Sequence, residues 1–93
     1  MKKIIKLGAE YCYPCKALSP IFKSISEMDD FKGVEFKEVD ADSDEGDEYT
    51  TKFNVRNVPT ILILDENNEL IKKMVGAMPR ESLITIFKKE LGL

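Results

Sequence analysis

Cys12 and Cys15, which are separated by two residues, are the side chains of this chain best suited to chemistry. A cysteine attacks a disulfide as its thiolate, and this spacing brings two sulfur atoms within bonding distance. One cysteine can therefore form a mixed disulfide with a substrate, and the other can resolve it. The spacing predicts a redox-active dithiol in the segment Cys12-Tyr13-Pro14-Cys15.

Two other interpretations of the cysteine pair stay open at this point. In one the cysteines are buried and inert, and in the other they are half of a zinc site. A structural zinc site needs four ligands, and the chain has no histidine and no second cysteine pair to complete one. We therefore expect no metal and no cofactor. The lack of histidine also excludes a Cys-His protease and histidine acid-base chemistry.

The segments around the cysteines predict a strand, a loop and a helix. Residues 2–7 are short and rich in β-branched side chains and end at Gly8, which is typical of a strand that opens onto a loop. From residue 14 to about residue 28, apolar side chains recur every three or four positions, as in a helix, and Pro20 should kink it. The cysteines then lie at the helix N-terminus, where unpaired N–H groups and the helix dipole favour a thiolate.

The rest of the sequence predicts three more strands and two more helices. The predicted strands are residues 34–39, 60–64 and 69–75, and the predicted helices follow the acidic stretch 40–48 and span residues 80–91. The resulting β-α-β-α-β-β-α order predicts a single α/β domain over residues 1–93. In this domain a mixed four-stranded sheet is flanked by three helices.

The chain resembles the thioredoxin family over nearly its whole length, and the segment around the cysteines is one feature that carries this resemblance. Residues 10–16, EYCYPCK, are similar to the family's active-site segment, with Tyr11 at the usual tryptophan and Tyr13 at the usual glycine. Pro20 matches the helix proline that the family places eight residues after its first cysteine. The resemblance implies a thioredoxin-like fold, with Cys12 as an exposed nucleophile and Cys15 as a buried resolving thiol.

Two further loops extend this resemblance. Val58-Pro59-Thr60 is similar to the family's cis-proline loop, and Val75-Gly76-Ala77 is similar to the glycine loop that completes its substrate groove. The groove that the resemblance implies consists of Tyr11, Tyr13, Pro14, Val58, Pro59, Gly76 and Ala77. The alternatives are an ordinary trans turn at Pro59, a rim position for Tyr11, and a Gly76 that only ends its strand.

One departure from the family concerns the proton that Cys15 must lose before it attacks the mixed disulfide. Thioredoxins place a buried aspartate six residues before the first cysteine and pair it with a lysine on the neighbouring strand. This chain has Lys6 at the first position and Glu38 at the second. We hypothesise a partly buried ion pair in which Glu38 acts as the base, directly or through water, and Lys6 stabilises the thiolate. The alternative is that both side chains point to solvent.

Composition limits the partners. The 93 residues are 43% hydrophobic and 33% charged, as in a globular domain, and the net charge of −3 without a basic run argues against nucleic acid. No stretch approaches the ~18 to 20 apolar residues of a membrane span, and the start does not read as an export signal. We therefore expect a cytoplasmic monomer without a membrane partner.

The predicted function is reduction of protein disulfides, with electrons from a reductase donor, most simply a thioredoxin reductase. Two alternatives remain. One is a glutaredoxin-like enzyme that uses glutathione, although residues 76–79, GAMP, lack the acid with which glutaredoxins grip that peptide. The other is a thioredoxin-fold binding module that holds a partner without turnover.

Overall fold

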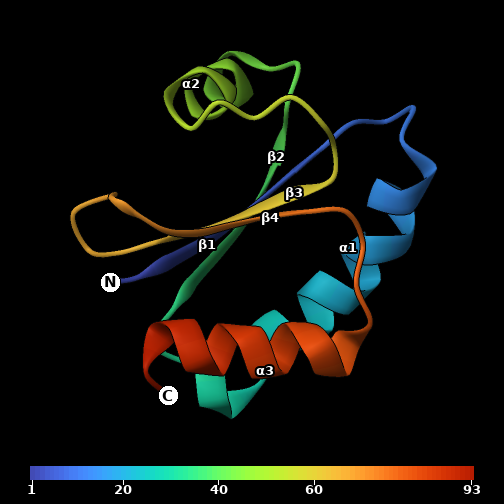
Figure 1. Cartoon of the computed structure of the whole chain (residues 1–93). Coiled ribbons are helices and arrows are strands. Elements are labelled where there is room, and N and C mark those ends of the chain that lie inside the picture. Colours follow the sequence, from blue (N-terminus) through green and yellow to red (C-terminus); the bar gives the residue numbers. More distant parts are fainter.

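The computed structural model describes all residues from Met1 to Leu93. Four strands and three α-helices follow one another in the predicted β-α-β-α-β-β-α order (Figure 1). One short 3-10 helix, η1, was not predicted from the sequence. The elements are β1 (Lys3–Gly8), α1 (Tyr13–Ser26), η1 (Asp29–Phe31), β2 (Glu35–Asp40), α2 (Asp44–Lys52), β3 (Thr60–Leu64), β4 (Leu70–Val75) and α3 (Arg80–Leu91). Helix α1 ends two residues before the predicted Met28, because Met28 is already extended, with φ −73° and ψ 138°.

The four strands form one mixed sheet in the order β2-β1-β3-β4. Strand β1 runs parallel to β2 and antiparallel to β3, and β3 and β4 form an antiparallel hairpin. The two central strands are buried along almost their whole length, as their apolar runs predicted. The parallel register sets Lys6 of β1 directly opposite Glu38 of β2.

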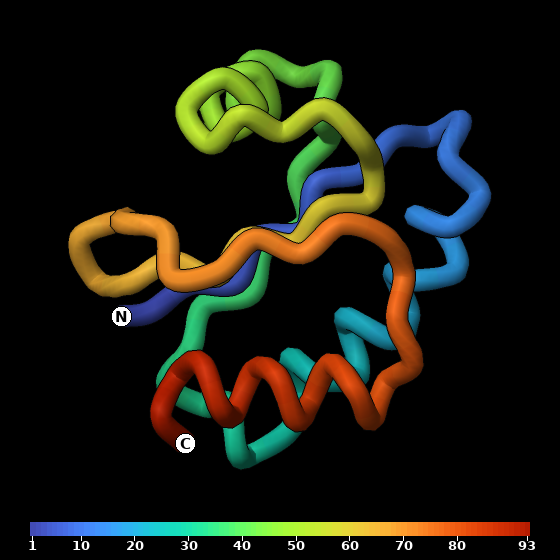
Figure 2. Tube along the Cα trace, in the orientation of Figure 1, coloured from blue at the N-terminus to red at the C-terminus, as the bar shows by residue number.

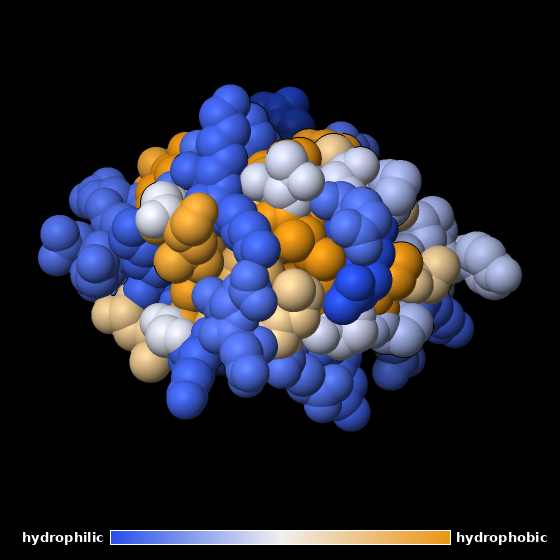
Figure 3. Space-filling model, turned by 90° about the horizontal axis from the view of Figure 1, so that it is seen from below, coloured by the Kyte–Doolittle hydropathy of each residue, from blue (hydrophilic) through white to orange (hydrophobic).

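Helices cover both faces of the sheet: α1 and α3 pack on one face and α2 on the other (Figures 1 and 2). Because side chains alternate along a strand, Ile4 and Ile61 contribute to the core under α1 and α3, whereas Ile5 and Leu62 contribute to the core under α2. Viewed from the α3 side, hydrophilic side chains dominate the outer surface, with apolar side chains between them (Figure 3). No helix combines the length and the apolar character needed to cross a membrane.

Candidate functional site

The two cysteines lie at the junction of β1 and α1. Cys12 is the N-cap of α1, with an extended backbone (φ −92°, ψ 106°), and Cys15 lies in the first turn. A disulfide joins them, with a Cα–Cα distance of 5.2 Å. The Cys15 backbone N–H donates to Cys12 Sγ at 3.2 Å. The helix N-terminus thus points a hydrogen-bond donor at the sulfur of Cys12, which is the arrangement that favours a thiolate once the disulfide is reduced.

The exposure of the two cysteines differs from the expectation in one respect. Cys12 is 8% exposed and Cys15 is 3% exposed, so both are buried in the disulfide form. The expectation that Cys12 is exposed was therefore wrong for this form, because Ala9 and Val58 pack against the pair. Cys12 is still the more accessible of the two.

The predicted substrate groove begins next to the disulfide. The Val58–Pro59 peptide is cis, as the resemblance implied, and Val58 packs against the cysteine cluster. The Pro59 carbonyl accepts a hydrogen bond from the Gly76 N–H at 2.8 Å, which joins the two loops. Gly76 has a φ of +96°, a conformation that disfavours a side chain, so it does more than end β4.

The other predicted groove residues lie at the surface of the same region. Tyr11 and Tyr13 are 78% and 81% exposed, which is high for aromatic side chains. Tyr11 also lines a cavity of about 310 Å³ together with Val58. Pro14 and Ala77 are exposed neighbours of Cys15 and Gly76 in the chain. The structure therefore places two large, solvent-accessible aromatic rings beside the disulfide.

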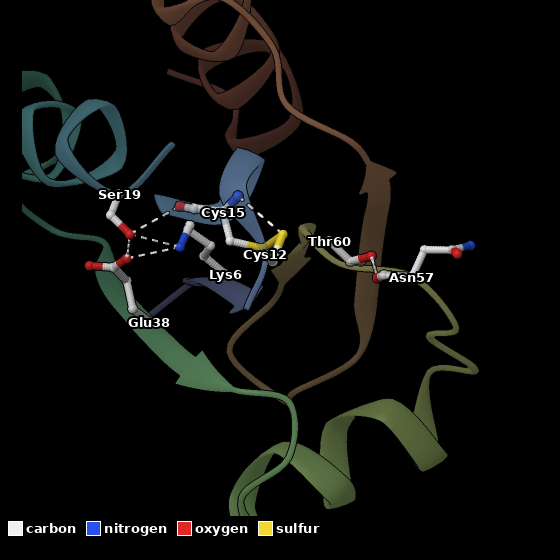
Figure 4. The surroundings of a disulfide bond; sticks show 7 residues. All are labelled: Lys6, Cys12, Cys15, Ser19, Glu38, Asn57 and Thr60. Atoms are coloured by element: carbon white, nitrogen blue, oxygen red, sulfur yellow. Dashed lines mark hydrogen bonds and ion pairs between the residues drawn. A yellow bond between two sulfur atoms is a disulfide. The ribbon is translucent and has the colours of Figure 1, made fainter. Parts of the chain in front are cut away.

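Lys6 and Glu38 form the ion pair that the sequence suggested. Lys6 Nζ lies 3.0 Å from Glu38 Oε1, and the exposed fractions of the two side chains are 5% and 43%. The lysine is therefore buried, whereas the half-exposed glutamate reaches it from the neighbouring strand β2 (Figure 4). The alternative in which both side chains point to solvent does not hold for Lys6.

Ser19 completes this network, and the sequence analysis missed it. Its hydroxyl accepts from Lys6 Nζ at 3.0 Å and lies 2.8 Å from Glu38 Oε1 and 3.2 Å from the Cys15 carbonyl oxygen (Figure 4). A hydroxyl has one proton, so it donates to either of these acceptors at a time. The available signal was helical spacing: Ser19 is four residues after Cys15 and so shares its helix face.

A cavity of about 340 Å³ connects the disulfide with this network. Its lining consists of Lys6, Gly8, Ala9, Glu10, Cys15, Lys16, Ser19, Glu38, Val39 and Asp40. A polar cavity of this size has room for water between the Cys15 sulfur and the Glu38 carboxylate. No cluster of three or more histidine, cysteine, aspartate or glutamate side chains in the structure could hold a metal ion.

Comparison with known proteins agrees with this geometry. The sequence model of the Thioredoxin family matches residues 1–89. A thioredoxin of Bacillus subtilis is 35% identical over 83 residues, which are 89% of this chain and 76% of that protein. The thioredoxin Asp f 29 of Aspergillus fumigatus is 36% identical over 76 residues, which are 82% of this chain and 66% of that protein.

A solved structure extends the agreement to three dimensions. The crystal structure of the Malassezia sympodialis thioredoxin Mala s 13 superposes with a TM-score of 0.79 at 29% identity, over 96% of this chain and 75% of that one. The match covers the sheet and its flanking helices, and the cysteine pair of this chain lies at disulfide distance within it. The chain belongs to the thioredoxin family of thiol-disulfide oxidoreductases.

Proposed function

We propose that this protein reduces disulfides of cytoplasmic proteins through Cys12 and Cys15. The observation that carries the proposal is the hydrogen bond from the Cys15 N–H to Cys12 Sγ at the N-terminus of α1. This donor and the helix dipole favour negative charge on Cys12, and a thiolate is the form that attacks a disulfide. Family membership supports the same activity.

The cycle has two thiol-disulfide exchanges. The Cys12 thiolate attacks one sulfur of the substrate disulfide, which breaks the substrate S–S bond, forms a mixed disulfide and releases one substrate thiolate. Cys15 then loses its proton and attacks Cys12 Sγ, which forms the Cys12–Cys15 disulfide and releases the second substrate thiolate. We assign the proton of Cys15 to Glu38, through water in the 340 Å³ cavity that both residues line. The two released thiolates take up protons from solvent.

The groove orients the substrate. Val58 packs against the two cysteines, cis-Pro59 follows it in the chain, and the hydrogen bond from the Gly76 N–H to the Pro59 carbonyl joins the two loops into one surface. Backbone groups of such a surface suit an extended peptide, which can pair with them as an added strand. The exposed rings of Tyr11 and Tyr13, which precede and follow Cys12 in the chain, supply contact area at low entropic cost. Pro14 and Ala77 complete the edge of this surface.

The oxidised protein must be reduced for the next cycle. We propose that a reductase, most simply a thioredoxin reductase, supplies the electrons to the same pair of sulfur atoms, and that the protein acts as a monomer. The relatives named thioredoxins support this assignment of the donor class.

A two-phase exchange experiment tests the function. The fully reduced protein is mixed with an aromatic disulfide reagent that releases one coloured thiolate in a bimolecular step, by attack of Cys12, and a second in a unimolecular step, by attack of Cys15. We expect both phases in the unchanged protein, only the first in Cys15→Ser, and neither in Cys12→Ser. In Glu38→Gln, the second phase should slow by roughly 10²-fold, as is typical when a general base is lost.

Two comparisons make the result decisive. Glu45→Gln removes the same charge from an exposed carboxylate outside the site and should leave both phases unchanged. Catalytic reduction of insulin with a reductase donor separates an enzyme from a binding module, because a module binds without turnover. A Cys12→Ser variant that still reduces insulin would refute the proposed function.

A further inference from the structure

The charge buried behind the disulfide is positive. Lys6 lies on the β1 face toward α1 with a side chain only 5% exposed, whereas its partner Glu38 is 43% exposed. An exposed charge is screened by water and salt, and a buried charge is screened much less. The Lys6 ammonium therefore acts on its surroundings more strongly than the nearby carboxylate does.

Gly8 brings this ammonium close to Cys15. A Cβ atom added at Gly8 would lie 3.4 Å from both Lys6 Nζ and Cys15 Sγ. The nitrogen and the sulfur are therefore separated by at most twice that distance. An ammonium has three N–H donors, and Ser19 and Glu38 accept two of them, so one remains for the cavity between Lys6 and the sulfur.

The other charged groups that face the cavity are Glu10 and Lys16 beside the cysteines and Asp40 at the end of β2. All three are exposed, and their charges sum to one negative charge that water screens. Lys6 is thus the one buried charge among the five ionisable groups, besides Cys15, that line this space.

We infer that Lys6 raises the reduction potential of the Cys12–Cys15 pair, and that Glu38 and Ser19 act as positioning residues that hold its ammonium beside Cys15. The disulfide carries no charge, but its reduction by two electrons with uptake of one proton leaves one thiol and one thiolate. A fixed cation close to the sulfur atoms stabilises only this reduced form, which makes the disulfide easier to reduce. The inference rests on the proposed function, and it specifies how strong an oxidant the Cys12–Cys15 disulfide of this protein is.

The test is the equilibrium constant between the protein and a graded dithiol-disulfide buffer, with free thiols trapped and counted. Lys6→Met removes the charge but keeps a long apolar stem suited to a buried site. We expect it to shift the constant roughly tenfold toward the disulfide, which corresponds to a potential ~30 mV lower. Glu38→Gln keeps an oxygen that can accept from the Lys6 ammonium but removes the opposing negative charge, so it should shift the constant in the opposite direction, although it slows the resolving phase.

Matched controls come from a second Lys-Glu ion pair. Lys37 and Glu45 are both about half-exposed and lie away from the cavity. Lys37→Met changes the net charge as Lys6→Met does, and Glu45→Gln changes it as Glu38→Gln does, but both should leave the constant within twofold. A Lys6→Met constant within twofold of the unchanged protein, or a shift no larger than that of Lys37→Met, would overturn the inference while the proposed function stands. Failure of the unchanged protein to exchange with the buffer at all would refute both.

Discussion

At the scale of single residues, burial separates Lys6 from an otherwise similar lysine. Lys37 also pairs with a glutamate, Glu45, and the hydrogen bond that its ammonium donates to this carboxylate raises the pKa of Lys37. Both members of this second pair are more than 40% exposed, however, and an exposed ion pair contributes little to stability. Pairing with a carboxylate is thus common to both lysines, and of the two only Lys6 is buried close to Cys15, where its charge is screened less.

A third ion pair gives a prediction for the pH dependence of stability. Lys88 of α3 lies 2.7 Å from Asp30 of η1 and lowers the pKa of that carboxyl below its ordinary value of 3.8. Because the folded pKa is the lower one, the pair stabilises the fold above pH 3.8, and this contribution is lost as the pH falls through the folded pKa. We expect Asp30→Asn to lower the free energy of unfolding slightly at pH 7 and by less at pH 2. Urea titrations at both pH values measure this difference, and an equal change at both would contradict it.

At the scale of elements, the start of α2 depends on a close approach to the end of β2. Ser43 caps the helix, because its hydroxyl accepts from the Gly46 N–H at 3.0 Å. The acidic side chains in the first turn stabilise the helix further, because their negative charges lie at the positive end of the helix dipole. Gly46 packs so tightly that an added Cβ would lie 2.0 Å from the Asp40 carbonyl oxygen. Farther along α2, burial raises the pKa of Tyr49, whose side chain packs against the core cluster under the helix. The helix is thus held against the strand that carries Glu38.

Gly46→Ala tests this contact. Alanine favours a helix by roughly 1 kcal/mol over glycine, but here the added methyl group meets backbone that cannot move independently. We expect the clash to dominate and to lower the free energy of unfolding by roughly 1–3 kcal/mol. Gly33→Ala is the control, because a Cβ there meets nothing within 4 Å and should change stability little. Urea denaturation of both variants decides the point, and stabilisation by Gly46→Ala would contradict it.

At the scale of the whole molecule, the two sides of the sheet carry unequal cores. The side under α1 and α3 holds a cluster of 12 buried residues, and the side under α2 holds a cluster of 5. The larger core includes edge-to-face contacts among Phe31, Phe36 and Phe87. Most of the buried apolar surface that stabilises the fold therefore lies on the α1 side, which is also the side where Lys6 lies buried.

This asymmetry predicts unequal costs of truncation. Phe87 is fully buried and contacts both other rings, so Phe87→Ala should lower the free energy of unfolding by roughly 3–5 kcal/mol. Phe53→Ala, on the opposite side, removes a half-buried ring and should cost clearly less. Thermal and urea unfolding of the two variants measure the difference. Equal losses would show that the smaller core contributes as much as the larger one.

The sequence by itself predicted the order of the elements and the reacting pair. Strand β3 and helix α3 have the boundaries expected from the apolar run at residues 60–64 and from the helical periodicity of residues 80–91. Cys12 and Cys15 were identified because their chemistry depends on local spacing. These features depend on neighbours along the chain, so a single sequence contains them.

Only the tertiary structure decided how segments far apart in the chain meet at the site. That Lys6 lies opposite Glu38 depends on the parallel register of β1 with β2, and its burial and its contact with Ser19 depend on the packing of α1 on the sheet. The burial of Cys12 likewise depends on Val58, 46 residues away. Hydrophobic periodicity shows which face of a helix or strand is apolar. It does not show which polar side chains of another element will contact that face, so it does not predict such pairings.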